Sequence, residues 1–125
     1  MKVTKTYFML MAGDVVRGAS FYKNALGLKP GGYESPEWTE LAQNGTTVAL
    51  HRGGSSTERD TGLGFYVDDM DAACKAVAAA GGKVVKQPEA RRDEGITLAT
   101  AVDTEGNRFS IAQELPRTRR LSRRS

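Results

Sequence analysis

The sequence contains the same arrangement of elements twice, and this duplication is the strongest constraint on its fold. The two copies are TYFMLMAGDVVRGASFYKNALGL at residues 6–28 and GLGFYVDDMDAACKAVAAAGGKV at residues 62–84. Each copy opens with a short apolar strand and then meets an aspartate, whose carboxylate can accept a free backbone N–H at the start of a helix. Each predicted helix ends at a glycine, which readily adopts the left-handed conformation of a helix end. The two pairs are Asp14 and Asp69, and Gly27 and Gly81.

Strand-like sequence follows each predicted helix. After the first come KPGGYE, WTELAQ and TTVALHR, and Asn44-Gly45 between the last two is typical of a tight hairpin. After the second come KVVKQP, ITLATAVD and RFSIAQ. Each half is therefore predicted to be a βαβββ unit, which alone would leave one face of its sheet uncovered. We expect an α+β fold in which two βαβββ modules form curved mixed sheets around a shared cavity.

The domain organisation follows from this duplication. We expect a single domain over residues 1–115, with module one at 1–54, a linker at 55–60 and module two at 61–115. The remaining segment, 116–125, holds five arginines and no acidic residue, and we expect it to be a disordered basic tail. Without those five, the 18 basic residues fall to 13 against 15 acidic ones, so the rest of the chain carries about −2. No aromatic residues alternate with the arginines, so no specific nucleic-acid partner is predicted.

Two residue types that occur once exclude some classes of site. The single cysteine, Cys74, excludes an internal disulfide and fits a reducing compartment. The single histidine, His51, excludes a histidine-rich metal site within one chain. No apolar run is long enough to cross a bilayer, and the N-terminus lacks a signal-peptide pattern. We therefore expect a cytoplasmic protein with no membrane partner.

Three segments, together with the strand that leads to Asp14, carry a resemblance to a known family. They are FYKNALGL at 21–28, FYVDDMDAACKAVAAAGG at 65–82 and DTEGNRFSI at 103–111. Taken together, they make the sequence similar to the vicinal oxygen chelate superfamily, also called the glyoxalase/bleomycin-resistance/dioxygenase fold. The resemblance implies the duplicated fold described above, and it implies a homodimer.

The same resemblance identifies the positions where metal-using members hold an ion. These members usually place His, Gln or Glu near the start of each module's first strand and in each module's last strand. Here the resemblance assigns these positions to Tyr7, Ala49, Gly62 and Ser110. Neutral hydroxyls bind divalent ions weakly without carboxylate or imidazole ligands. His51 lies two residues beyond Ala49 and would add only one ligand, so we expect no metal and no other cofactor.

The inward face of the predicted sheets is aromatic, with a few polar groups. Side chains alternate between the two faces of a strand, and this alternation defines the candidate ligand-binding residues. They are Tyr7, Met9, Trp38, Glu40, His51, Tyr66, Arg108 and Ser110. A surface of this kind suits a flat or amphipathic small molecule. Structural roles are the alternative: the tyrosines would be core residues with an exposed hydroxyl, and Glu40 would pair with Arg108.

The sequence favours a binding protein over an enzyme, and no catalytic residue is assigned. By resemblance, it would be a metal-independent small-molecule binding protein similar to bleomycin- or mitomycin-type resistance proteins. The main alternative is a glyoxalase-like lyase or isomerase, or a dioxygenase-type enzyme. A metal-free enzyme with His51 or Glu40 as general base, and a module that senses a metabolite, are two further alternatives. The sequence leaves open the ligand, and whether the modules pair within one chain or between chains.

Overall fold

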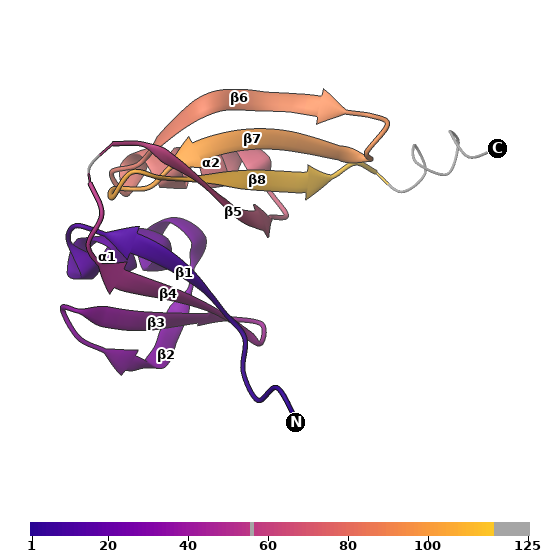
Figure 1. The fold of residues 1–125 in the computed structure, drawn as a ribbon. Coiled ribbons are helices and arrows are strands. Elements are labelled where there is room, and N and C mark those ends of the chain that lie inside the picture. The colour runs from indigo at the N-terminus through magenta and orange to yellow at the C-terminus, as the bar shows by residue number, and fades with distance from the viewer. Residues whose placement is uncertain (56, 117–125) are drawn as a thin grey trace.

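The computed structural model describes residues 1–55 and 57–116, and it shows two modules with the same order of elements (Figure 1). The first module consists of β1 (Tyr7–Ala12), α1 (Val15–Leu26), β2 (Lys29–Glu34), β3 (Trp38–Gln43) and β4 (Thr46–Arg52). The second consists of β5 (Arg59–Tyr66), α2 (Met70–Ala79), β6 (Lys83–Arg91), β7 (Ile96–Val102) and β8 (Asn107–Glu114). The predicted α+β fold of two βαβββ modules is confirmed. Because β5 begins at Arg59, its first two residues fall within the stretch expected to be a linker.

Each module forms a four-stranded mixed sheet in which its first strand lies beside its last. The strand orders are β1-β4-β3-β2 and β5-β8-β7-β6. The pairs β1–β4 and β5–β8 are parallel, and all other neighbouring strands are antiparallel. In each module the helix lies on one face of the sheet, which leaves the opposite face free of helices (Figure 1).

The two predicted helix starts and the predicted hairpin turn are present in the structure. Asp14 and Asp69 each accept a backbone N–H of the first helical turn at 3.0 Å. α1 ends at Gly27, which has a φ of 70°. α2 ends one residue earlier than predicted, at Ala80, and Gly81 follows it with a φ of 99°. The β3–β4 hairpin turns at Asn44 and Gly45, and both have the positive φ (46° and 79°) that a tight primed turn requires.

The hydrophobic core runs through both modules. Buried residues of the helices and of the helix-facing sides of the strands form one cluster, in which Leu10, Leu41 and Ile111 are almost fully buried. Phe21 on α1 lies 6.0 Å from Phe109 on β8, measured between ring centroids. The two modules therefore share apolar burial, which is the main stabilising contribution to a fold of this size.

The turn between β7 and β8 is a second connection between the modules. Three of its polar residues are buried: Asp103, Glu105 and Asn107. The carboxylate of Glu105 accepts the backbone N–H of Asp14 at 2.9 Å and the guanidinium of Arg17 at 2.7 and 3.1 Å. The side-chain amide of Asn107 donates to the carbonyl oxygen of Met11 at 2.9 Å. These contacts attach module two to the start of α1 and the end of β1.

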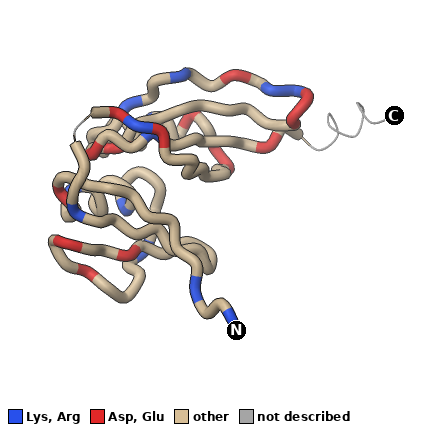
Figure 2. Tube along the Cα trace, viewed as in Figure 1, with Lys and Arg blue, Asp and Glu red and all other residues tan. Residues whose placement is uncertain are grey.

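Charged side chains and prolines protect the two outer edges of the sheets. β6 is an outer edge, and charges of both signs lie along it and along the turn that follows (Figure 2). The other outer edge is β2, and each outer edge carries a proline, Pro30 on β2 and Pro88 on β6, which has no N–H to donate. β1 and β5 are the inner edges, and both line one groove between the modules.

Two further predictions concern the ends of the chain and membranes. Apart from Pro116, the arginine-rich segment expected to be a tail lies outside the described residues. Neither helix within the described ranges has the length and apolar character needed to span a bilayer.

Candidate ligand-binding surface

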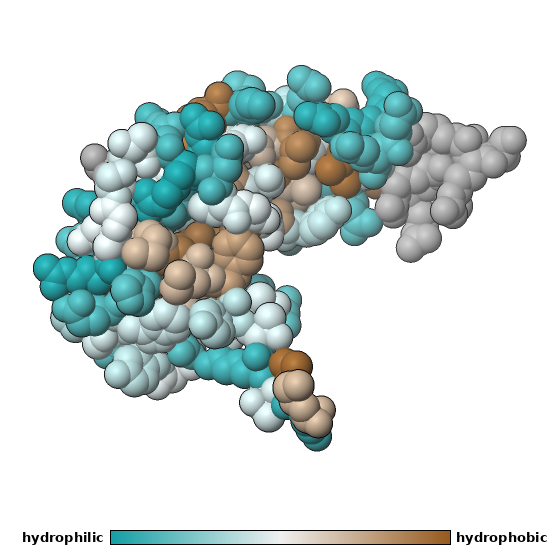
Figure 3. All heavy atoms as spheres, in the orientation of Figure 1, coloured by the Kyte–Doolittle hydropathy of each residue, from teal (hydrophilic) through white to brown (hydrophobic). Residues whose placement is uncertain are grey.

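The faces of the sheets opposite the helices carry exposed apolar side chains. Along β1, Leu10 and Ala12 are buried under α1, whereas Tyr7 and Met9 on the other face are 53% and 47% exposed. Apolar residues gather near the middle of this face of the molecule, and a hollow opens between the modules (Figure 3). Large exposed apolar side chains that lie together often mark a binding surface.

Trp38 is the centre of an aromatic cluster on the first sheet, made of Tyr7, Trp38 and His51. The Tyr7 and His51 rings lie 5.6 and 5.9 Å from the Trp38 ring, at interplanar angles of 81° and 78°. Trp38 and His51 are direct neighbours across β3 and β4. Such edge-to-face contacts fix the rings relative to one another. The cluster thus offers a preformed aromatic surface.

Glu40 gives this cluster a fixed negative group. Its carboxylate accepts the Trp38 indole N–H at 2.9 Å and forms an ion pair with Lys5. The hydrogen bond from Lys5, and then the one from Trp38, hold the pKa of Glu40 below its usual range. A carboxylate with a lowered pKa is a weak base, which argues against Glu40 as a general base. The alternative that Glu40 pairs with Arg108 is wrong, because Lys5 is its partner.

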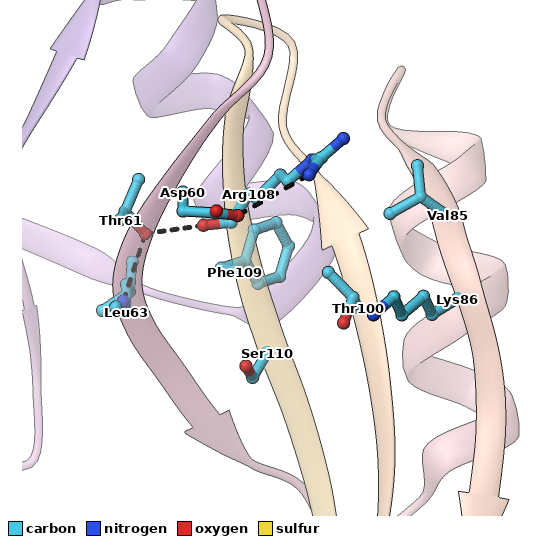
Figure 4. Close-up of a pocket in the computed structure, with 10 residues that line it drawn as sticks. Asp60, Thr61, Leu63, Val85, Lys86, Thr100, Arg108, Phe109 and Ser110 are labelled. Atoms are coloured by element: carbon cyan, nitrogen blue, oxygen red, sulfur yellow. Dashed lines mark hydrogen bonds and ion pairs between the residues drawn. The ribbon is translucent and has the colours of Figure 1, made fainter.

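A pocket of about 260 Å³ lies on the helix-free face of the second sheet (Figure 4). We call it the module-two pocket. Its polar lining consists of Asp60 and Thr61 on β5, Lys86 on β6, Thr100 on β7, and Arg108 and Ser110 on β8. Arg108 contacts the Glu58 carboxylate at 3.1 Å and the Asp60 carboxylate at 3.7 Å. The hydrogen bond from Lys83, and then the one from Arg108, lower the pKa of Glu58.

A groove of about 410 Å³ between β1 and β5 connects these two regions, and we call it the intermodule groove. Tyr7 and Met9 line it from the first module. Asp60 and Thr61 line both this groove and the module-two pocket. A ligand could therefore extend from the aromatic cluster to the second sheet. The combined hollow lies within the size range of small-molecule sites.

The structure brings most, but not all, of the predicted site residues together. Tyr7, Met9, Trp38, Glu40 and His51 share one face of the first sheet, and Arg108 and Ser110 line the module-two pocket. Tyr66 is separate from them. It is 71% exposed and borders a different hollow near the end of β5, beside Gln113.

Sequence reasoning missed Lys86 and Thr100, which both line the module-two pocket. Thr100 could have been found, because it lies opposite Ser110 in the β7–β8 hairpin. Lys86 could not be placed by alternation. The register of β6 against β7 shifts on both sides of Lys86, so the regular period of two is interrupted there.

The strand register also changes which residues lie at the family's metal-ligand positions. Ala49 lies beside Met9 rather than Tyr7, and Ser110 lies beside Gly64 rather than Gly62, because β5 contains an irregularity between Asp60 and Gly64. Neither assignment supplies a carboxylate or an imidazole. Among the described residues, no three of His, Cys, Asp and Glu lie close enough together to hold an ion. The donor set therefore does not fit a divalent metal ion.

Comparison with known proteins identifies related sequences and folds. The sequence model of the glyoxalase-like domain family matches residues 7–112. A hypothetical protein of S. aureus, SA1046, has a TM-score of 0.71 at 23% identity, covering 90% of this chain and 95% of its own. A glyoxalase/bleomycin resistance protein/dioxygenase family enzyme of Burkholderia phytofirmans has a TM-score of 0.72 at 22% identity, covering 87% and 97%.

A third structure was determined with bound ligands. FosX, the fosfomycin resistance protein of Listeria monocytogenes, has a TM-score of 0.76 at 16% identity over 100% of both chains. Its E126Q mutant was crystallised with Mn(II) and 1S,2S-dihydroxypropylphosphonic acid. At these identities the likeness shows the fold alone. No curated protein matches the sequence.

Proposed function

Since this chain belongs to the glyoxalase-like domain family, we propose that it is a metal-independent protein that binds an aromatic or amphipathic small molecule. The observation that carries this proposal is the aromatic cluster of Tyr7, Trp38 and His51, in which Tyr7 is exposed and lines the intermodule groove. Aromatic side chains held in fixed orientations provide stacking area at low entropic cost. The role would resemble that of resistance proteins that sequester a toxic compound.

The donor chemistry supports binding without a metal. The positions where metal-using relatives hold an ion carry methionine or tyrosine, alanine, glycine and serine in this chain. The main alternative, a lyase, isomerase or dioxygenase of the same fold, would need stronger ligands. Glu40, one of the two candidate bases for a metal-free enzyme, has a lowered pKa and is already paired with Lys5.

A homodimer is part of the proposal. In the single chain the helix-free faces of both sheets stay open, and Tyr7 and Met9 remain about half exposed. A second copy placed over these faces would close the hollow and exclude water from the ligand. Light scattering should show twice the monomer mass at micromolar concentration. A monomer at every accessible concentration would restrict the site to one chain.

Fluorescence of Trp38 tests the proposal directly, because it is the only tryptophan in the chain. We expect flat aromatic compounds, including bleomycin- and mitomycin-type drugs, to shift or quench its emission in a saturable manner. Tyr7→Ala should weaken binding, whereas Tyr33→Ala, at an exposed tyrosine outside the aromatic cluster and the intermodule groove, should not. Equal affinities for the two variants, or no response to any compound, would contradict ligand binding at the aromatic cluster.

Metal analysis separates the binding protein from the enzyme. The purified protein should hold no stoichiometric metal, and titration with Ni, Zn, Mn or Fe(II) should neither bind tightly nor produce lyase or dioxygenase activity. One tightly held ion per chain together with such an activity would favour the alternative.

A further inference from the structure

A row of four neighbouring residues crosses the second sheet, and three of them, Lys86, Thr100 and Ser110, line the module-two pocket. Lys86 on β6 lies opposite Thr100 on β7, Thr100 lies opposite Ser110 on β8, and Ser110 lies beside Gly64 on β5. Lys86 extends from β6 toward Thr100, and the Ser110 hydroxyl lies farther along the same face (Figure 4). One ammonium and two hydroxyl groups are therefore gathered on one face of the sheet.

These three side chains have no hydrogen bond or ion pair with any of the described residues. This distinguishes them from two other polar groups of the pocket. The Thr61 hydroxyl donates to the carbonyl oxygen of Arg108 at 2.6 Å, and the Arg108 guanidinium contacts Glu58. The row thus keeps its donors available for a ligand.

The charges around the pocket favour an anion. Lys83 and Arg108 are held by Glu58, and Arg108 also lies near Asp60. Lys86 is the third cationic side chain of this group. Three cationic side chains and the two carboxylates of Glu58 and Asp60 give the group a net charge of +1. This charge belongs to Lys86, the one residue of the group that has no carboxylate partner among the described residues.

We propose that the row of Lys86, Thr100 and Ser110 binds an oxyanion group, a phosphonate, phosphate or carboxylate, of the small-molecule ligand. This inference rests on the proposed function and makes it more specific: the ligand is an aromatic acid. An ammonium and hydroxyl groups bind such oxygens through charge-assisted and neutral hydrogen bonds. Gly64 leaves space above Ser110, where a side chain would otherwise stand.

The position of the row also orients the ligand. Asp60 and Thr61 border both the module-two pocket and the intermodule groove, so the two hollows meet at β5. The acid group of the ligand binds at the row on the second sheet, and its aromatic body reaches through the groove toward Tyr7.

Three probes separate this inference from the proposed function: phenylphosphonate, benzyl alcohol and inorganic phosphate. Binding of each is measured by calorimetry and by backbone amide shifts in NMR, at constant ionic strength. We expect phenylphosphonate to bind more tightly than either of the others, and phosphate to shift amides near Thr100 and Ser110. Lys86→Met should weaken phenylphosphonate about tenfold, the loss expected for one charge-assisted contact.

Matched variants control for charge and folding. Lys75→Met removes one positive charge from the exposed surface of α2, outside the pocket, and should leave every affinity unchanged. Gly64→Leu adds a side chain beside Ser110. Gly64 does not have the positive φ that would strain a larger residue, and its Cβ would lie at an ordinary contact distance of 3.7 Å from that of Ser110. This variant should weaken phenylphosphonate and phosphate while leaving benzyl alcohol unchanged.

The outcomes distinguish the two proposals. If phenylphosphonate binds Lys86→Met and the wild type equally, the oxyanion row is wrong while the aromatic site stands. If phosphate binds with the expected dependence on Lys86 but neither aromatic compound changes the fluorescence of Trp38, the row stands and the aromatic binding function is wrong. If none of the three binds, both proposals are overturned.

Discussion

Tyr22 on α1 donates its phenolic hydroxyl to the carboxyl group of Asp103 across 2.6 Å, and this buried hydrogen bond joins the two modules. Burial, and then the charge of Asp103, raise the pKa of Tyr22 well above its usual range, so the hydroxyl stays protonated and remains a donor. The second carboxyl oxygen of Asp103 accepts the backbone N–H groups of Glu105 and Asn107 at 2.7 and 2.9 Å. Asp103 therefore shapes its own turn and attaches it to α1.

Removing this hydroxyl should loosen the attachment between the modules. Tyr22→Phe keeps the packed ring but leaves one oxygen of Asp103 with fewer donors, so the free energy of unfolding should fall by about 1–3 kcal/mol. Urea denaturation followed by circular dichroism measures this change. Tyr33→Phe, at an exposed tyrosine, is the control and should have no effect. Equal midpoints for the two variants would mean that the hydrogen bond does not stabilise the fold.

Glu105 should make stability depend on pH in the acid range. Burial alone would raise its pKa, but hydrogen bonds from Arg17, Thr104 and the backbone of Asp14 together lower it. A group whose folded pKa lies below its unfolded value, about 4.3 for glutamate, stabilises the fold above that value. This contribution is lost as the pH falls through the folded pKa. Glu105→Gln should therefore be less stable than the wild type at pH 7, and the difference should shrink below about pH 4.

Urea midpoints measured from pH 7 down to pH 2.5 for both proteins check this expectation. Asp68→Asn, at an exposed position between β5 and α2, is a suitable control for the loss of one carboxylate. A difference between Glu105→Gln and the wild type that stays constant over this range would contradict the role of ionised Glu105.

Gly82 should tolerate no side chain, because the modules approach each other closely there. A Cβ at this position would lie 2.5 Å from the carbonyl oxygen of Val102 and 2.6 Å from the ring of Phe21. Gly82→Ala should lower the free energy of unfolding by about 1–3 kcal/mol, the usual cost of overpacking. Gly64→Ala is the matched control, since its Cβ would meet only ordinary contacts. Thermal denaturation of the two variants gives the comparison, and an unchanged melting temperature for Gly82→Ala would contradict the close approach.

Local sequence signals were sufficient to predict the modules. The aspartates at both helix starts, the glycine that ends α1 and the Asn44-Gly45 turn act within a few residues, so their effect can be derived from the chain alone. Alternation in β1 and β3 also placed Tyr7, Trp38 and Glu40 on one face. These strands are regular, and the period of two therefore holds along their whole length.

The remaining features of the site depend on contacts between distant segments. The irregularity in β5 moved Gly64 beside Ser110, and the shifts in β6 placed Lys86 in the same row. The DTEGN turn, at 103–107, has the composition of an exposed loop, yet its acidic residues are buried because α1 supplies their partners. Composition and local pattern do not encode such pairings, which exist only once the modules meet.

The pKa of Glu40 should depend on which of its two hydrogen-bond donors, Lys5 or Trp38, is removed. Lys5 is the larger cause of its lowered pKa, and the Trp38 indole is the second. Lys5→Met should therefore raise the pKa of Glu40 toward its usual value, and Trp38→Phe should raise it by less. Carbon-detected NMR of the Glu40 carboxyl group across an acid titration measures both shifts, with Lys2→Met as the control for a lost positive charge near the N-terminus. If Trp38→Phe gave the larger rise, the indole rather than Lys5 would hold this carboxylate in its place beside the aromatic cluster.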